Sequence, residues 1–153
     1  MNIDFFRIKD RSVILLLVSM LFQLVSLILY GATGLTEFTA ELSSAVLAFS
    51  ILSLISGAGI VLITVLGICE KYTKKVLDIG IYVVYLFGLL AWLFYITSQV
   101  NYLVNIFVAI DGTKLTAAFI LTVLFFLFAW FAALVSAILY RASNKLSEAK
   151  ANE

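Results

Sequence analysis

The sequence predicts an all-α integral membrane protein whose four transmembrane helices form an antiparallel bundle. Of its 153 residues, 64% are hydrophobic and only 12% are charged, whereas soluble domains are about half apolar and about a quarter charged. A soluble domain of this size leaves much of its surface in water, so this composition excludes an ordinary soluble domain. It also excludes a disordered chain, which needs low hydrophobicity and high charge.

Four apolar runs predict the four helices, because about 20 apolar residues cross a bilayer at about 1.5 Å per residue. We place the helices at about residues 12–33, 43–69, 76–108 and 115–141. The third run is most apolar from Ile79 to Ser98 and more polar beyond, so the length of its helix past Ser98 stays open. We expect a single domain over 1–153, in which 142–153 form a polar cytoplasmic tail.

Lys and Arg predict the orientation, because cytoplasmic loops are enriched in them. Nine of the ten basic residues flank one side of the predicted bundle: Arg7, Lys9, Arg11, Lys71, Lys74, Lys75, Arg141, Lys145 and Lys150. We therefore expect both termini in the cytoplasm, a location in the plasma or inner membrane, and contact with an anionic inner leaflet. A cleaved signal peptide at the N-terminus is a competing interpretation that leaves the other three helices in the same orientation.

The two halves of the chain show a weak likeness that suggests a parallel 2+2 internal repeat. Residues 36–40 resemble residues 113–117, and residues 22–24 resemble residues 98–100 at nearly the same offset. Apolar segments often resemble one another by chance, so duplication and chance both remain open.

Polar residues on one face of the first helix form a candidate site. Ser19, Gln23 and Ser26 recur at spacings of four and three, which is one helical face. Gln23 lies near the middle of its helix, where an unpaired amide is costly in lipid, so it must face protein or water. The stripe either lines a pore or a ligand site, or it makes hydrogen bonds between helices.

The end of the third apolar run holds a second polar group. It consists of Ser98, Gln99, Asn101, Tyr102 and Asn105. The group is either an outer binding patch or an interfacial helix whose amides meet water and headgroups.

Small residues in the second and fourth helices predict the packing faces, because they let helix backbones approach closely in lipid. The positions that we assign to helix packing are Ser53, Gly57, Ala129 and Ala133. We expect the bulky aromatic residues of the fourth helix to face lipid or a partner: Phe125, Phe126, Phe128, Trp130 and Phe131.

The chain offers no residues for which we predict a catalytic, cofactor-binding or metal-binding role. It has no His and one Cys, and its acidic residues lie outside the central apolar runs, so a nucleophile–base pair or an intramembrane carboxylate is not expected. We predict a non-catalytic accessory or assembly subunit, which associates with itself or with other membrane-protein subunits and not with nucleic acid. The alternatives are an oligomeric channel or facilitator for a small polar solute and, less favoured, an enzyme acting on lipid.

Overall fold

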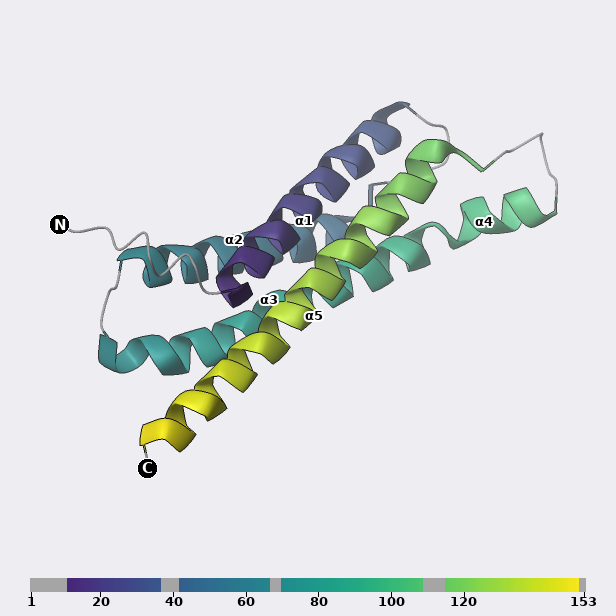
Figure 1. Ribbon diagram of the computed structural model, residues 1–153. Helices are drawn as coiled ribbons and strands as arrows, with labels where there is room; N and C mark the ends of the chain where they lie inside the picture. The colour runs from purple at the N-terminus through teal and green to yellow at the C-terminus, as the bar shows by residue number, and fades with distance from the viewer. Residues whose placement is uncertain (1–10, 37–41, 67–69, 109–114, 152–153) are drawn as a thin grey trace.

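The protein forms a bundle of long helices, as the sequence predicts (Figure 1). The structure, a computed structural model, describes residues 11–36, 42–66, 70–108 and 115–151. The helices are α1 (Arg11–Thr36), α2 (Ser44–Leu66), α3 (Glu70–Ser98), α4 (Val100–Phe107) and α5 (Ala117–Ala151). Four segments are long and apolar enough to cross a membrane: Arg11–Thr33, Ser44–Thr64, Ile79–Ser98 and Ala117–Arg141. The prediction of an all-helical chain with four long apolar helices is thus confirmed.

The third predicted helix differs from the structure, because the chain expected to form one helix over 76–108 forms two. α3 ends at Ser98, and Gln99 adopts φ −98° and ψ 6° before α4 begins. The Gln99 N–H lies 3.2 Å from the Tyr95 carbonyl oxygen and 3.1 Å from that of Ile96. This shared bond tightens the last turn of α3. α4 continues beyond the end of α3, at the right of Figure 1.

The fourth predicted helix is longer than expected. α5 continues to Ala151, although we expected its helix to end near residue 141 and a polar tail to follow. The segment 142–151 contains three Ala, two Lys, a Leu and a Glu, which are good helix formers. The helix propensity of these residues therefore explains why α5 continues past its apolar part.

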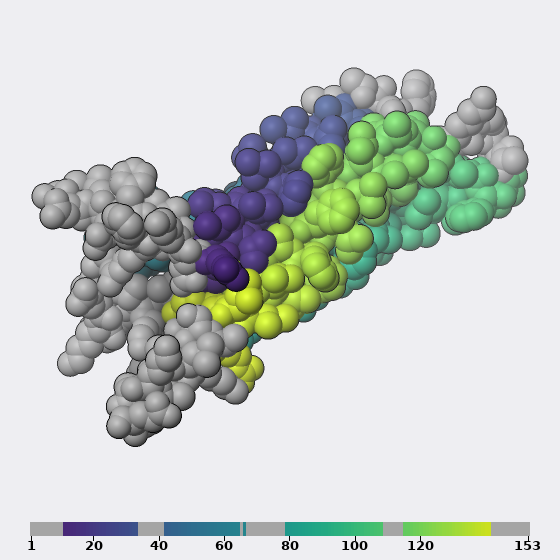
Figure 2. All heavy atoms as spheres, viewed as in Figure 1, coloured from purple at the N-terminus to yellow at the C-terminus, as the bar shows by residue number. Residues whose placement is uncertain are grey.

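The four long helices pack around a common interior. α1 packs along α5, α2 packs along α3, and α3 also contacts α5, while the contact between α1 and α2 is less extensive. α1 and α5 lie side by side in the space-filling view, as the purple-to-blue and green-to-yellow atoms of Figure 2 show. In Figure 1, the start of α1, the end of α2, the start of α3 and the end of α5 all lie toward the left.

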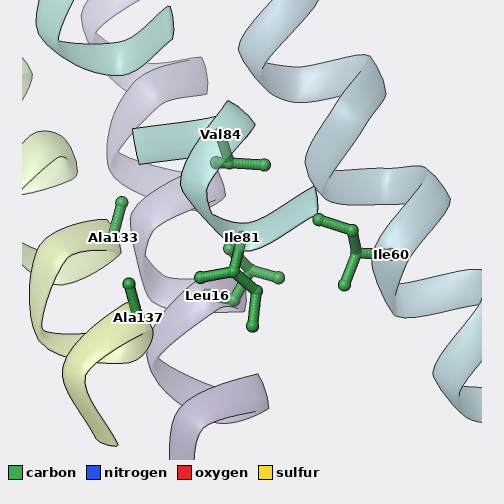
Figure 3. Close-up of a cluster of buried hydrophobic side chains, with 6 residues drawn as sticks. All are labelled: Leu16, Ile60, Ile81, Val84, Ala133 and Ala137. Carbon is green, nitrogen blue, oxygen red and sulfur yellow. The ribbon is translucent and has the colours of Figure 1, made fainter. Parts of the chain in front are cut away.

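One end of the interior holds an apolar cluster to which all four long helices contribute. Its members, which we call the Leu16 cluster, are Leu16, Ile60, Ile81, Val84, Ala133 and Ala137. Figure 3 shows the two alanines of α5 on one side of the cluster, with Leu16 and the side chains of α3 in the middle and Ile60 on the other side. The small alanine side chains let α5 approach α1 and α3 closely.

The other end of the interior is aromatic. The Tyr30 cluster consists of Tyr30, Val46, Ala91, Tyr95 and Phe126. The ring of Tyr95 meets the ring of Tyr30 edge-on at 5.3 Å and that of Phe126 at 5.2 Å. The expected outward orientation of Phe126 is wrong, because its side chain is 0% exposed, whereas Phe128 is 49% exposed. Because lipid and core are both apolar, composition does not distinguish an inward from an outward Phe in such a helix.

Two tyrosines each hold the start of the following helix. In the first tyrosine clamp, the Ser43 N–H donates to Tyr30 Oη over 2.6 Å. In the second tyrosine clamp, the Thr116 N–H donates to Tyr102 Oη over 3.2 Å. Each bond satisfies a backbone N–H at or next to a helix start, where no carbonyl of the same helix can accept it.

Candidate functional site

A layer of polar side chains lies inside the bundle between the Leu16 cluster and the Tyr30 cluster. Ser19, Gln23 and Ser26 belong to α1, and Ser50 and Ser53 belong to α2. Each of these five residues, the polar layer, is at most 4% exposed. The predicted stripe of α1 thus points into the bundle, and two serines of α2 join it.

Three members of the polar layer donate hydrogen bonds to backbone carbonyl groups. Ser19 Oγ donates to Ala129 O of α5 over 2.7 Å, and Ser53 Oγ donates to Val84 O of α3 over 3.3 Å. Ser26 Oγ donates to Gln23 O within α1 over 2.8 Å. The first two bonds join different helices, so these serines contribute to packing. Each such bond is worth about 1 kcal/mol.

The two remaining members of the polar layer have a polar atom without a partner. Gln23 Nε2 and Ser50 Oγ are both buried, and neither makes a hydrogen bond within the described part of the chain. An unsatisfied buried group of this kind costs about 1–3 kcal/mol. The other serine of α2 in the polar layer, Ser53, donates to the carbonyl group of Val84.

Two contacts join α1 to α2 on either side of these residues. A Cβ placed on Gly57 would lie only 2.8 Å from Sδ of Met20, so the backbone of α2 at Gly57 lies against the Met20 side chain. The first tyrosine clamp fixes the register again ten residues further along α1. Gln23 of α1 and the serines Ser50 and Ser53 of α2 lie between these two contacts along their helices.

Two tryptophans between α3 and α5 carry further unpaired donors. The rings of Trp92 and Trp130 stack at 5.9 Å with an interplanar angle of 6°, and Tyr85 stacks on the other side of Trp130 at 6.1 Å. Both indole N–H groups are buried and lack a partner among the described residues, as does the hydroxyl of Ser12. The sequence does not indicate this stack, because the aromatic residues of α5 follow one another too closely to show which of them point inward.

The second predicted group is divided rather than gathered on one surface. Gln99 and Tyr102 are buried, Asn101 is exposed, and Ser98 and Asn105 are half-buried. The break at Gln99 places Ser98 in α3 and the others in α4 or at its start. Tyr102 turns inward because its hydroxyl takes part in the second tyrosine clamp.

The residues assigned to helix packing lie inside the bundle. Ser53, Gly57, Ala129 and Ala133 are all buried. Gly57 contacts Met20 of α1, and Ala133 belongs to the Leu16 cluster. Their small side chains allow the neighbouring helices to approach.

The polar layer offers hydrogen bonds and no ionisable group. Within the residues that the structure describes, no group of three His, Cys, Asp or Glu side chains could hold a metal ion. The layer joins helices by hydrogen bonds, and its five side chains include no nucleophile–base pair. Comparisons with protein-family models, with curated proteins and with solved structures found no match for this chain.

Proposed function

We propose that this chain is a non-catalytic integral membrane protein that acts as an accessory or assembly subunit. The observation that carries the proposal is the distribution of its side chains: the polar layer points inward, while large apolar side chains cover the outside of the long helices. Leu21, Ile28 and Ile55 are each more than 60% exposed. Such an exterior suits lipid and other transmembrane helices as neighbours.

The topology that we propose has four crossing helices in an antiparallel bundle with both termini in the cytoplasm. Hydrogen bonds from Ser19 to Ala129 and from Ser136 to Ser12 support it, because residue numbers rise along α1 as they fall along α5. The bias of nine basic residues to one side supports the orientation.

Labelling of single cysteines tests the orientation. In a variant without Cys69, a cysteine at residue 37 or 113 should react with an impermeant reagent in intact cells. A cysteine at residue 9 or 150 should react only after permeabilisation. The opposite pattern would contradict the proposed orientation.

The assembly surface that we propose is the outer face of α2. Gly59 has no atom within 4 Å of the position where a Cβ would lie, and the neighbouring side chains of Ile55 and Leu62 are exposed. A glycine on an otherwise apolar outer face allows another helix to approach closely.

Two matched variants test assembly in mild detergent. Gly59→Leu should shift the assembly to smaller size, or release a co-purifying subunit, without changing the thermal midpoint of the single chain. Gly57→Leu should lower that midpoint, because Gly57 contacts Met20 within the chain. If Gly59→Leu leaves the size distribution unchanged, α2 does not form the assembly surface.

Flux measurements in liposomes test the channel alternative. A pore between copies of the chain would need the polar stripe on the outside, whereas Ser19, Gln23 and Ser26 are buried within one chain. We therefore expect no solute flux. Flux that Gln23→Leu abolishes without changing the fold or the assembly would replace our proposal with the channel.

A further inference from the structure

We propose that the outward side of α4 is a lipid-binding surface, which contacts the acyl chains of the leaflet around it. This surface, the α4 face, consists of Val100, Val104, Phe107 and, at the C-cap, Val108. Each of these side chains is at least 47% exposed, and Phe107 is 85% exposed. The inference rests on the proposed membrane insertion of the chain and not on its orientation or assembly.

The outward side of α4 continues the outward side of α3 across the break at Gln99. Buried residues recur every three or four positions from one helix into the next: Ile81, Val84, Gly88, Ala91, Tyr95, Gln99 and Tyr102. Exposed residues do the same, since Leu86, Leu93, Val100 and Phe107 follow one another at intervals of two helical turns. One apolar stripe therefore runs along both helices and faces away from the bundle. Lipid that covers this stripe on α3 also meets it on α4.

The length of the stripe sets the level that it reaches in the bilayer. α4 extends past the end of α3 in Figure 1, and the chain from Ile79 to Val108 is about 45 Å long at about 1.5 Å per residue. The hydrocarbon core is about 30 Å thick, and the bilayer with its headgroups is about 40–45 Å thick. The α4 face therefore lies where acyl chains meet headgroups. Tilting of the helix or local thickening of the bilayer keeps such an apolar end in lipid at a modest cost.

The polar residues of α4 favour lipid over a protein partner. Residues 99–108 include no charged side chain, so they offer no ion pair that would select a partner protein. Asn101 is exposed and Asn105 is half-buried, and the two lie one turn apart along an edge of the α4 face. An uncharged helix with an apolar face and a polar edge suits the boundary between acyl chains and headgroups. The second tyrosine clamp, on the opposite side of α4, fixes the side that points outward.

Nitroxide labels on single cysteines test the proposal in phosphatidylcholine vesicles. The labels are carried by Val104→Cys or Phe107→Cys in a chain with Cys69→Ser. Each label should collide more often with oxygen, which concentrates in lipid, than with a nickel chelate, which stays in water. The ratio of the two collision rates should therefore exceed one at both positions. Both side chains point out of the bundle, so the thermal midpoint of each variant should be unchanged.

Leu86→Cys separates this proposal from membrane insertion itself. Leu86 lies near the middle of the apolar segment Ile79–Ser98 and is 49% exposed. If collisions with oxygen prevail at residue 86 and collisions with the chelate prevail at residue 107, the chain is inserted and only the proposal for α4 is wrong. If the chelate prevails at both residues, the proposed membrane insertion is wrong as well. Low rates with both reagents at residue 107 would show that protein covers the α4 face, which also contradicts the proposal.

Discussion

The contact between Gly57 and Met20 makes a sharp prediction about the packing of α1 against α2. A Cβ added at Gly57 would lie 2.8 Å from Sδ and 2.9 Å from Cγ of Met20. Real Cβ atoms essentially never show such short contacts, and these atoms lie in the middle of the side chain rather than at its flexible tip. Gly57→Ala therefore requires Met20 to move, and overpacking of this kind typically costs about 1–3 kcal/mol.

Gly59 provides a matched control on the same helix. Replacing either glycine by alanine improves helix propensity by up to about 1 kcal/mol, and this gain is common to both variants. At Gly59 nothing lies within 4 Å of the added Cβ, so the gain is not opposed within the chain. Gly57→Ala should thus be less stable than Gly59→Ala by about 1–3 kcal/mol, which is the steric cost alone.

Equilibrium unfolding in mixed detergent micelles measures this difference. Met20→Ala removes both close atoms, so in a double-mutant cycle it should restore most of the stability that Gly57→Ala loses. Equal stabilities of the two glycine variants would refute the reasoning, as would a coupling energy near zero between residues 20 and 57. Either result would mean that α1 and α2 do not approach here.

Three further predictions use the same assay. Phe126→Ala should lower the free energy of unfolding by about 2 kcal/mol, because about 3–5 kcal/mol is typical in soluble cores and about 2 kcal/mol of that is transfer from water, which does not apply to a chain that unfolds in lipid. Phe128→Ala, which removes an exposed ring, should be near neutral. Equal costs for the two variants would contradict the inward placement of Phe126. Trp130→Phe should cost about 0.5–1.5 kcal/mol through the shortened stack with Trp92, because the lost indole N–H has no partner among the described residues; an unchanged stability would argue against the stack. Tyr30→Phe should cost about 1–3 kcal/mol and speed amide exchange at Ser43, whose N–H loses its acceptor; unchanged exchange would argue against the clamp.

The long helices follow from sequence because their physical requirement is simple. About 20 apolar residues suffice for each helix, and each apolar run meets that requirement without any knowledge of its neighbours. The inward direction of Gln23 follows equally well, because lipid offers an amide no hydrogen-bond partner at all, whereas the inside of a bundle holds other polar groups. Strong energetic preferences of this kind act on single residues, so the sequence alone indicates them.

The remaining features depend on contacts that the sequence does not display. Phe126 and Phe128 are chemically identical, and only the position of Tyr95 in another helix makes the first one buried. The break at Gln99 involves neither Gly nor Pro, so no local signal marks it. Ser50 is buried only because α2 packs against other helices, which is a property of the assembled bundle.

Because of the tyrosine clamps, the position of a helix start does not depend on the length of the segment that connects it to the preceding helix. Tyr30 bonds the backbone of Ser43, and Tyr102 bonds that of Thr116, so each helix start is tied to the preceding helix by a side chain rather than by the connecting segment. The entropy of closing a loop grows only slowly with its length. Insertions at residues 37–41 or 109–114 should therefore leave the bundle intact, which makes these segments natural places to attach an epitope or a fluorescent reporter.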